Sequence, residues 1–509
     1  MTRKTNQIRG GIVLSYLSLV VGNAVGIIYT PIMIRLLGQS EYGLYNLVSS
    51  FVAYLGLLSF GFDNTYLRYY TQYKEKESKY KVASLNGMFL IVFCIIGALA
   101  GLCGMILRQY SDVIFGSNLT ASELETAKTL MLLLVINIAI TFPSNLFSVY
   151  INANEKFIFN RIVGMLKTVI NPFIVLPLLL MGYKSVALVS VTLGFSILVL
   201  IINVIYCVRK LDLRFSFSDF DFSVFKGIAT FSFFVFLGEI VDEINWQLDK
   251  FLLGRYSGTV AVAIYGVASS LSSYYRQFSM AISNVFAPRV NRIVATSNDN
   301  DTLTNLMIKV GRTQFMVLSM VAIGFWFCGR EFCCLWAGYD YEESYLIAMT
   351  LMLPSTIPLI QNVGVSLLTA RNKHKFRSVA YFFIAILNAA ISIPLCQIMQ
   401  GLGCAIGTGI SMIVGNGLTI NLYYRKLGID VKKFWLSILS LSKGTIPMFL
   451  IGIILTMFKT HYSWLDLCIR IIVMVVAYII GMVYIGMNSE EKVIVQNMWF
   501  KLKNKFLRN

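Results

Sequence analysis

Long apolar runs, separated by short polar segments, recur from one end of this 509-residue chain to the other. Most runs hold about 20 residues, which is the length that a helix needs to cross the hydrocarbon core of a bilayer. The pattern therefore predicts an all-α polytopic membrane protein with about fourteen transmembrane helices. The expected spans are 11–37, 42–66, 82–107, 126–152, 158–181, 185–208, 223–253, 259–288, 304–328, 342–369, 376–399, 402–424, 434–458 and 464–487.

Composition supports a membrane protein and excludes a soluble multidomain chain. The sequence is 57% hydrophobic and 13% charged, whereas soluble domains carry about 25% charged residues. The net charge of +18 would suit a nucleic-acid partner, but the basic residues sit in short clusters between apolar runs. Nine cysteines and two histidines show no metal spacing and no disulfide framework. No catalytic residue, metal site or nucleic-acid partner is expected.

The positions of Lys and Arg predict the orientation of the chain, because short cytoplasmic loops are enriched in these residues. With the N-terminus inside, 32 of the 43 Lys and Arg residues fall in inner segments and nine at outer ends. Lys167 and Arg276 remain within spans. Both termini are therefore expected in the cytoplasm. The tail from Ser489 is too polar to span and is expected either as an amphipathic helix on the inner membrane surface or as a frayed basic segment.

The two halves of the chain carry the same order of features. At an offset of 217 residues, Asn145, Lys156, Asn171 and Pro177 match Asn362, Lys373, Asn388 and Pro394. The pattern LLG followed by YG, residues 36–43, recurs at 252–266 with a longer turn. Each copy holds an even number of spans, so the copies are related by an axis along the membrane normal. The expected parts are a cytoplasmic N-terminus (1–10), a six-helix N-lobe (11–215), a six-helix C-lobe (216–428), two added helices (429–488) and a basic tail (489–509).

The stretch GEIVDEINWQLDKFLLG, residues 238–254, places several charges inside the seventh span. On a helical projection the charges share a sector of about 120°. A charge that faces lipid costs several kcal/mol, so this face is expected to meet a cavity or partner charges. Glu239, Asp242 and Glu243 are predicted to face a cavity. Asp249, Lys250 and Arg255 fit that reading or a position at the outer interface, and pairing within the face, such as Glu243 with Lys250, stays an alternative.

The eighth span holds Arg276 near mid-depth, with Asn284 two turns further on. Arginine is always charged and can bind a phosphate through two parallel hydrogen bonds. Arg276 is therefore predicted to contact an anionic substrate. A salt bridge to the acidic face of the preceding span is the alternative, and the two are compatible if the bridge opens for substrate. Weaker candidates in the first half are Arg35, Lys167 and Asp63.

Residues Pro31 to Tyr70, PIMIRLLGQSEYGLYNLVSSFVAYLGLLSFGFDNTYLRYY, combine a proline in the first span with R-x-LG, YGLY and a closing R-Y-Y. In the second half, DKFLLG (249–254) and YGVA (265–268) fit the same signature. The chain resembles bacterial oligosaccharide flippases. These are polysaccharide biosynthesis membrane proteins of the multidrug/oligosaccharidyl-lipid/polysaccharide superfamily, which also holds the MATE transporters. The resemblance covers the whole chain and leaves the carried glycan unspecified.

The resemblance implies a transporter of the bacterial inner membrane, not an enzyme. It would move an undecaprenyl-pyrophosphate-linked oligosaccharide to the outer leaflet by alternating access, for assembly of O-antigen, capsule or exopolysaccharide. The candidates for binding pyrophosphate or glycan are Arg276, Arg35, Lys167, Lys250 and Asn284. The candidates for coupling to H⁺ or Na⁺, or for gating, are Glu239, Asp242, Glu243, Asp249 and Asp63. A monomer without other cofactors is expected, in contact with membrane lipids and with a polysaccharide polymerase and glycosyltransferases as partners.

Three other functions stay open. A MATE-like cation antiporter would bind its substrate on the acidic seventh span, although Arg276 and the YGLY pattern argue against it. A polysaccharide polymerase or glycosyltransferase would need a large outer loop with paired carboxylates, which the sequence lacks. A non-transporting scaffold would tolerate neutralisation of Arg276 and Glu243 without loss of surface glycan. No GxxxxGK[ST] motif occurs, so this chain is not expected to hydrolyse ATP.

Overall fold

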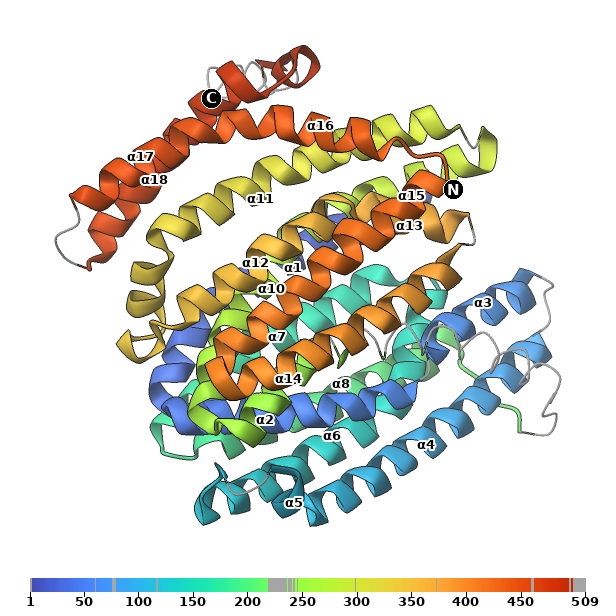
Figure 1. Cartoon of the computed structure of the whole chain (residues 1–509). Helices are drawn as coiled ribbons and strands as arrows, with labels where there is room; N and C mark the ends of the chain where they lie inside the picture. Colours follow the sequence, from blue (N-terminus) through green and yellow to red (C-terminus); the bar gives the residue numbers. More distant parts are fainter. Residues whose placement is uncertain are drawn as a thin grey trace, which may run out of the picture. The chain divides into compact units, whose positions relative to one another are not determined.

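The computed structural model describes residues 2–59, 61–75, 79–115, 118–217, 246–297, 299–371, 373–458 and 462–493, together with 236, 240, 243, 244, 496 and 497. Within these residues all regular structure is helical, as Figure 1 shows. The all-α prediction is thus confirmed for the described part of the chain. The structure divides into two compact units: unit 1 is Met1–Gly266 with Tyr381–Gly407, and unit 2 is Val267–Ala380 with Thr408–Asn509.

Unit 1 is built from the first spans of the sequence. Its main packed pairs are α4 with α6, α6 with α8, and α1 with α7. The helices are α1 (Thr2–Leu37), α2 (Gln39–Ala53), the 3-10 helix η1 (Tyr54–Ser59), α3 (Phe62–Glu75), α4 (Lys79–Gln109), α5 (Ser111–Phe115), α6 (Ala121–Ala153), α7 (Phe157–Leu180), α8 (Lys184–Leu211) and the first turns of α10 (Thr259–Thr296). Residues 246–256 are also helical and lead towards α10.

The predicted second span, 42–66, is not one straight helix. α2 ends at Ala53, a 3-10 segment follows, and α3 begins at Phe62 after Gly61, whose φ is +64°. Glycine accepts this left-handed backbone without the steric penalty that a Cβ brings. Beyond the break, Tyr66 and Tyr70 of α3 pack with Phe89 of α4 and Tyr150 of α6 in a buried aromatic core.

Helix α14 (His374–Met412) contains two predicted spans, because the chain reverses at Gln400, whose φ is +48°. The part within unit 1 forms a tight hairpin. A Cβ on Gly403 would lie 2.0 Å from the carbonyl oxygen of Leu395, so the two arms touch through their backbones. The Ser392 hydroxyl donates to Asn388 Oδ1 at 2.8 Å and lies 3.4 Å from the Cys404 carbonyl oxygen.

Unit 2 is organised around α11, which packs against α12, α16 and α18. Its elements after α10 are α11 (Asn300–Trp336), the 3-10 turn η3 (Tyr339–Tyr341), α12 (Ser344–Ile360), α13 (Asn362–Ala370), the π-helix η4 (Ile413–Ile420), α15 (Asn421–Lys426), α16 (Val431–Ser442), the 3-10 turn η5 (Lys443–Thr445), α17 (Ile446–Met457), α18 (Trp464–Gly481) and the π-helix η6 (Met482–Gly486). The predicted tenth span is thus broken at Gln361, between α12 and α13.

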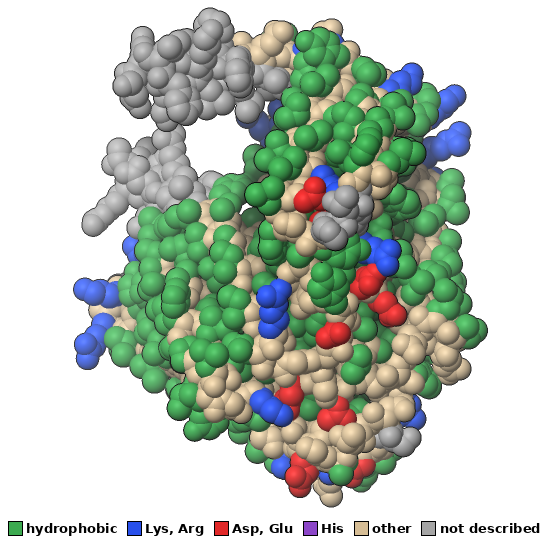
Figure 2. Space-filling model, turned by 90° about the vertical axis from the view of Figure 1, so that its left-hand side faces the viewer, with side chains coloured by type: hydrophobic (Ala, Val, Ile, Leu, Met, Phe, Trp, Pro, Cys, Tyr) green, Lys and Arg blue, Asp and Glu red, His purple; other side chains and the backbone are tan. Residues whose placement is uncertain are grey.

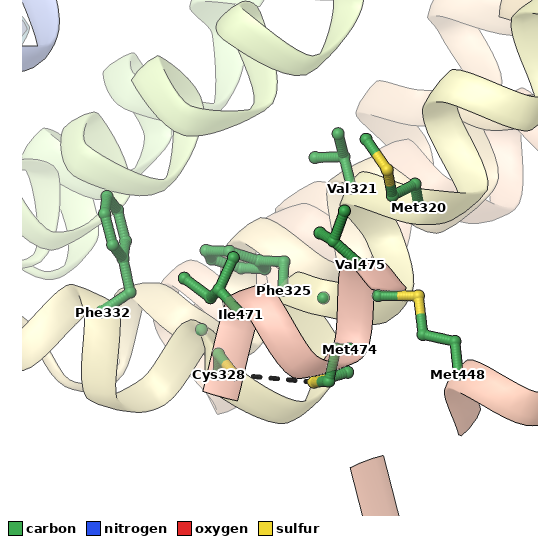
Figure 3. A pocket seen from close by; sticks show the side chains of 11 residues that line it. Met320, Val321, Phe325, Cys328, Phe332, Met448, Ile471, Met474 and Val475 are labelled. Atoms are coloured by element: carbon green, nitrogen blue, oxygen red, sulfur yellow. Dashed lines mark hydrogen bonds between the residues drawn. The ribbon is translucent and has the colours of Figure 1, made fainter. Parts of the chain in front are cut away.

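An apolar pocket of about 250 Å³ lies between α11, α17 and α18 (Figure 3). Met320, Phe325, Met448 and Met474 are among the side chains that line it. Since its lining carries no charged or amide group, this pocket has nothing that would recognise a phosphate or a sugar hydroxyl.

Ten helical segments of the described residues are long and apolar enough to cross a membrane. One of them, Val379–Lys426, holds two predicted spans because of the reversal at Gln400. On the face shown in Figure 2, hydrophobic side chains cover much of the described surface. Large exposed hydrophobic residues such as Ile28, Phe173 and Leu465 would be costly in water and suit contact with lipid. The prediction of a multi-pass membrane protein is therefore confirmed.

A buried arginine joins the two added C-terminal helices to α11. Arg312 is 4% exposed, and its Nε and Nη2 donate to the two carboxylate oxygens of Glu491 at 2.7 and 2.6 Å. The same guanidinium also donates to the carbonyl oxygens of Ser437 and Gly486 at 2.8 and 3.2 Å. Glu491 in turn accepts from the Asn488 backbone N–H at 2.9 Å, at the start of the helical residues 489–493. One side chain thus fixes α16, η6 and the beginning of the tail.

We expect Arg312→Ala to destabilise unit 2 by about 3–5 kcal/mol, because it leaves a buried carboxylate without its partner. Arg312→Lys should recover only part of the loss, since an ammonium cannot reproduce the forked contact. Thermal unfolding of the detergent-purified protein measures both effects. The matched control is Arg214→Ala, whose ion pair with Asp212 is 75% and 79% exposed and should change the free energy of unfolding by less than about 1 kcal/mol. An Arg312→Ala protein as stable as this control would contradict the stabilising role of Arg312.

Candidate functional site

The acidic seventh span is described only in part. Glu239 and Asp242 lie outside the described residues, and their predicted roles stay predictions. Glu243 is half-buried and Asp249 is 2% exposed.

Asp249 and Arg255 make contacts of a structural kind. Tyr265 of α10, which is 3% exposed, donates its hydroxyl to Asp249 Oδ2. Arg255 donates to the carbonyl oxygens of Val113 and Ile114, both at 3.0 Å. Asp249 and Arg255 thus take part in packing contacts of the outer part of this span, and their roles in transport stay predictions. Lys250, between them, is half-buried.

Several buried polar atoms of unit 1 have no hydrogen-bond partner among the described residues. They come from different spans: Tyr29 Oη from α1, Asn137 Oδ1 from α6 and Gln247 Oε1 from the seventh span. Leaving a buried polar atom unsatisfied costs about 1–3 kcal/mol. In a membrane protein such atoms indicate places where water or a ligand's hydroxyl groups complete the bonding.

The charged candidates of the first half differ in their surroundings. Lys167 lies in the middle of α7, is half-buried, and its ammonium is 3.4 Å from the Ser196 hydroxyl of α8. Arg35, in the last turn of α1, is exposed. Asp63 is half-buried in the first turn of α3. Of these three residues, only Lys167 combines a charge with a mid-span position and partial burial.

In unit 2, Arg276 lies on α10, is half-buried, and donates from Nη2 to the Ser273 hydroxyl at 2.8 Å. The neighbouring Tyr275 is fully buried and bonds to the Thr356 hydroxyl of α12 at 2.7 Å. Asn284, two turns further along, is exposed. The predicted exchange of Arg276 with the acidic seventh span is untested and stays a prediction.

Sequence reasoning missed a buried amide network at the break between α12 and α13. Gln361 donates to Asn421 Oδ1 at 2.8 Å, and the Asn421 amide donates to the carbonyl oxygens of Asn416 and Gly417 at 2.9 Å. Those two carbonyls belong to the π-helix η4, whose wider turn frees them. In the sequence, Asn416 is one of many polar residues within predicted spans, and no motif distinguishes it from the others.

Two glutamates at helix starts were also missed. Glu41, in the first turn of α2, accepts from the Ser185 hydroxyl at 2.5 Å and pairs with Lys184 at 3.4 Å, both at the start of α8. Glu123 completes a capping box with Thr120 at the start of α6. The spacing T-x-x-E before an apolar run is a recognisable helix start in the sequence. The contacts that Glu123 makes with other helices cannot be recognised in the sequence.

Comparison with known proteins identifies the family of this chain and structures that share its fold. Residues 8–294 match the model of a family described as polysaccharide biosynthesis protein. A proposed O-antigen transporter of Shigella flexneri is 22% identical over 404 residues, which cover 78% of this chain and 92% of that protein.

Solved structures share the fold at low sequence identity. The lipid II flippase MurJ, in an inward closed conformation, superposes with a TM-score of 0.73 at 16% identity, over 92% of this chain and 98% of that one. An inward-facing multidrug resistance MATE family transporter of the MOP superfamily gives a TM-score of 0.63 at 13% identity, over 83% and 99%. The predicted fold class and the resemblance stated from the sequence are confirmed.

We expect Asp249→Asn and Tyr265→Phe each to lower the stability of unit 1 by about 1–3 kcal/mol, because each leaves a buried polar group without its bond. The double variant should lose less than the sum, since both changes remove one shared interaction. Melting temperatures in detergent measure this cycle, with Asp112→Asn as the control, because that carboxylate is 57% exposed. Unchanged stability together with lost transport would instead make Asp249 a transport residue.

Proposed function

Because this chain belongs to the polysaccharide biosynthesis protein family, we propose that it is a flippase for a lipid-linked oligosaccharide. In this proposal it carries an undecaprenyl-pyrophosphate-linked glycan from the cytoplasmic to the outer leaflet of a bacterial inner membrane, for assembly of a surface polysaccharide. The observation that carries the proposal is the similarity to the Shigella flexneri O-antigen transporter along 92% of that protein. The MurJ-like fold agrees with it, since MurJ is a lipid II flippase.

The substrate's chemistry fits the groups described above. The pyrophosphate of this substrate is esterified at both ends, so it is a dianion at neutral pH and needs cationic or N–H partners where water is scarce. Arg276 and Lys167 are the cations that we assign to it, with Arg35, Lys250 and Asn284 in secondary positions along its path. The unsatisfied atoms of Tyr29, Asn137 and Gln247 are suited to sugar hydroxyl groups. The polyprenyl tail stays in the hydrocarbon phase, where it costs nothing to solvate.

Coupling to an ion gradient is part of the proposal. Glu243, with Glu239 and Asp242 on the same predicted helix face, would bind H⁺ or Na⁺, and Asp63 is a weaker candidate. One elementary charge that crosses 100 mV supplies about 2.3 kcal/mol, enough to bias the inward and outward states by more than tenfold. Both termini would lie in the cytoplasm, as the distribution of Lys and Arg predicts. The protein would act as a monomeric transporter and not as an enzyme, next to the glycosyltransferases and the polymerase of its pathway.

A second candidate is a MATE-like antiporter of organic cations. The observation that favours it is the acidic character of the seventh span, together with a fold shared with a multidrug MATE transporter. A cationic substrate would use Glu243 directly and would gain nothing from Arg276. The two candidates therefore differ in which of these charges transport requires.

We expect Arg276→Ala to abolish export of glycan while the protein still inserts into the membrane, because the pyrophosphate loses its forked donor. Surface polysaccharide at native expression is the measurement. Arg292→Ala is the matched control, since Arg292 is an exposed arginine on the same helix α10. Normal surface polysaccharide in cells that carry the Arg276→Ala variant would contradict the flippase proposal. Continued efflux of an organic cation by that variant would support the antiporter.

Reconstitution tests the coupling ion. In proteoliposomes with defined undecaprenyl-pyrophosphate-linked glycans, we expect an inward-directed H⁺ or Na⁺ gradient to accelerate translocation by the wild-type protein. Glu243→Gln should abolish that acceleration and leave the slow, gradient-free rate, because the amide cannot bind the ion as a carboxylate does. Equal acceleration in the variant would exclude Glu243 as the coupling residue.

A further inference from the structure

In unit 2, α10 and α12 lie side by side (Figure 1) and are joined by two hydrogen bonds about one helical turn apart. The hydroxyl of Tyr275, a residue that is 1% exposed, bonds to the Thr356 hydroxyl at 2.7 Å. The hydroxyl of Ser279, which is fully buried, donates to the carbonyl oxygen of Leu359 at 2.9 Å. Arg276 lies between these two residues of α10. The segment that carries Arg276 is thus attached to α12 at both of its ends.

The break between α12 and α13 supplies the acceptor of the second bond. Leu359 lies in the last turn of α12, where carbonyl oxygens lack the partners that a continuing helix would give them. Hydrocarbon offers no replacement, so such an oxygen needs a donor from the protein. The Ser279 hydroxyl is such a donor. The interruption of the tenth span therefore helps to fix the position of α10.

Gln314 of α11 also holds Ser279. Its side chain is fully buried, and its Nε2 donates to the Ser279 hydroxyl oxygen at 2.8 Å and to the Ser279 carbonyl oxygen at 3.1 Å. Because the amide donates to the hydroxyl oxygen, the hydroxyl hydrogen is available for the carbonyl of Leu359. These groups form one chain of hydrogen bonds that runs from α11 through α10 to the end of α12.

The guanidinium group of Arg276 is held within α10. Its Nη2 donates to the Ser273 hydroxyl, one turn earlier on the same helix, at 2.8 Å. A helix turns by about 100° and advances by about 1.5 Å per residue, so a slip of α10 by one residue would point Arg276 in another direction. The bonds of Tyr275 and Ser279 to α12 oppose such a slip.

The first copy of the sequence repeat lacks these groups. The YG pattern of residues 42–43 recurs at residues 265–266, an offset of 223 residues. At this offset the counterparts of Tyr275, Arg276 and Ser279 carry no hydroxyl group and no charge; they are Val52, Ala53 and Gly56. The cation and the two hydroxyl groups therefore occur together in the second copy and are absent together from the first. A packing requirement common to both copies does not account for this difference, whereas the positioning of a cation does.

We propose that Tyr275, Ser279 and Gln314 are positioning residues, which hold Arg276 in the direction in which it meets the pyrophosphate of the substrate. The inference rests on the proposed flippase function, in which Arg276 binds that group. A forked contact between a guanidinium and a phosphate requires two parallel hydrogen bonds, so it depends on the direction of the side chain. A side chain that is already held loses less rotamer freedom on binding, and the network thereby raises the affinity for the anion.

Binding of an undecaprenyl-pyrophosphate-linked glycan to the detergent-purified protein tests the positioning. We expect Thr356→Val and Gln314→Leu each to weaken binding about two- to tenfold, which corresponds to the loss of one hydrogen bond. In an Arg276→Ala background the same changes should have no further effect, because the group that they position is gone. Thr356→Val keeps the shape of the side chain, so it still tests the network if Gln314→Leu does not fold.

Thr350→Val is the matched control. The hydroxyl of Thr350 donates to the carbonyl oxygen four residues earlier in α12, as that of Thr356 does. Only the Thr356 hydroxyl also bonds to Tyr275. The control variant should therefore bind the lipid-linked glycan with the affinity of the wild-type protein.

The register of α10 against α12 is measured without substrate. Phe278 of α10 and Leu353 of α12 are 46% and 45% exposed, and each can be replaced by p-acetylphenylalanine, which accepts a spin label without use of the native cysteines. Electron paramagnetic resonance then gives the distance between the labels. We expect one narrow distance distribution for the protein with the intact network and for Thr350→Val, and a broader or shifted one for Thr356→Val and Gln314→Leu.

The outcomes separate positioning from packing and from the proposed function. Unchanged affinity in both network variants would overturn the positioning role. An equal loss of affinity in the Arg276→Ala background would overturn it too, since it would reveal a general structural effect. An unchanged distance distribution in both variants would show that the network does not fix the register. If the wild-type protein binds no lipid-linked pyrophosphate while the variants change the distance distribution, the proposed function fails and the network is structural only.

Discussion

A polar or charged group inside a membrane-spanning helix must find a partner, because hydrocarbon offers none. The described part of this protein follows that constraint in two ways. Arg312 meets Glu491 and two backbone carbonyls, and Asp249 meets Tyr265, so these charges fasten helices together. Lys167 has a hydroxyl group 3.4 Å away, and Tyr29 Oη and Asn137 Oδ1 have no hydrogen-bond partner among the described residues, so these are the groups that we assign to the substrate. The groups of the first kind pair within the protein, and those of the second kind form the site that we propose.

The same constraint explains where the helices are interrupted. A break in a helix frees backbone groups, which are tolerated in a membrane protein only beside polar partners or a water-filled space. At Gln361 the break adjoins a side-chain amide network that uses carbonyl oxygens of the π-helix η4. The interruption of this span thus lies beside buried polar groups of unit 2.

Glycine plays the complementary part, because it allows backbones to meet where side chains would hold them apart. The hairpin at Gly403 uses this for a permanent contact within α14. Between α2 and α10 it allows an equally close approach at Gly43, where a Cβ would lie 1.8 Å from the carbonyl oxygen of Thr259. Both contacts bring backbones closer together than any larger residue would permit.

The sequence by itself determined the helical class, the multi-pass membrane character and the family, because each depends on local properties: apolar runs of membrane length and short motifs. It also singled out the charges within spans, since any charge there stands out against an apolar background. It could not divide those charges into structural and functional groups. That Asp249 bonds to Tyr265, that Gln361 reaches Asn421, and that Ser279 bonds to the carbonyl oxygen of Leu359 depends on helices distant in the chain. Only tertiary packing decided these pairings, because a hydrogen bond forms between atoms about 3 Å apart, whatever their separation in the sequence.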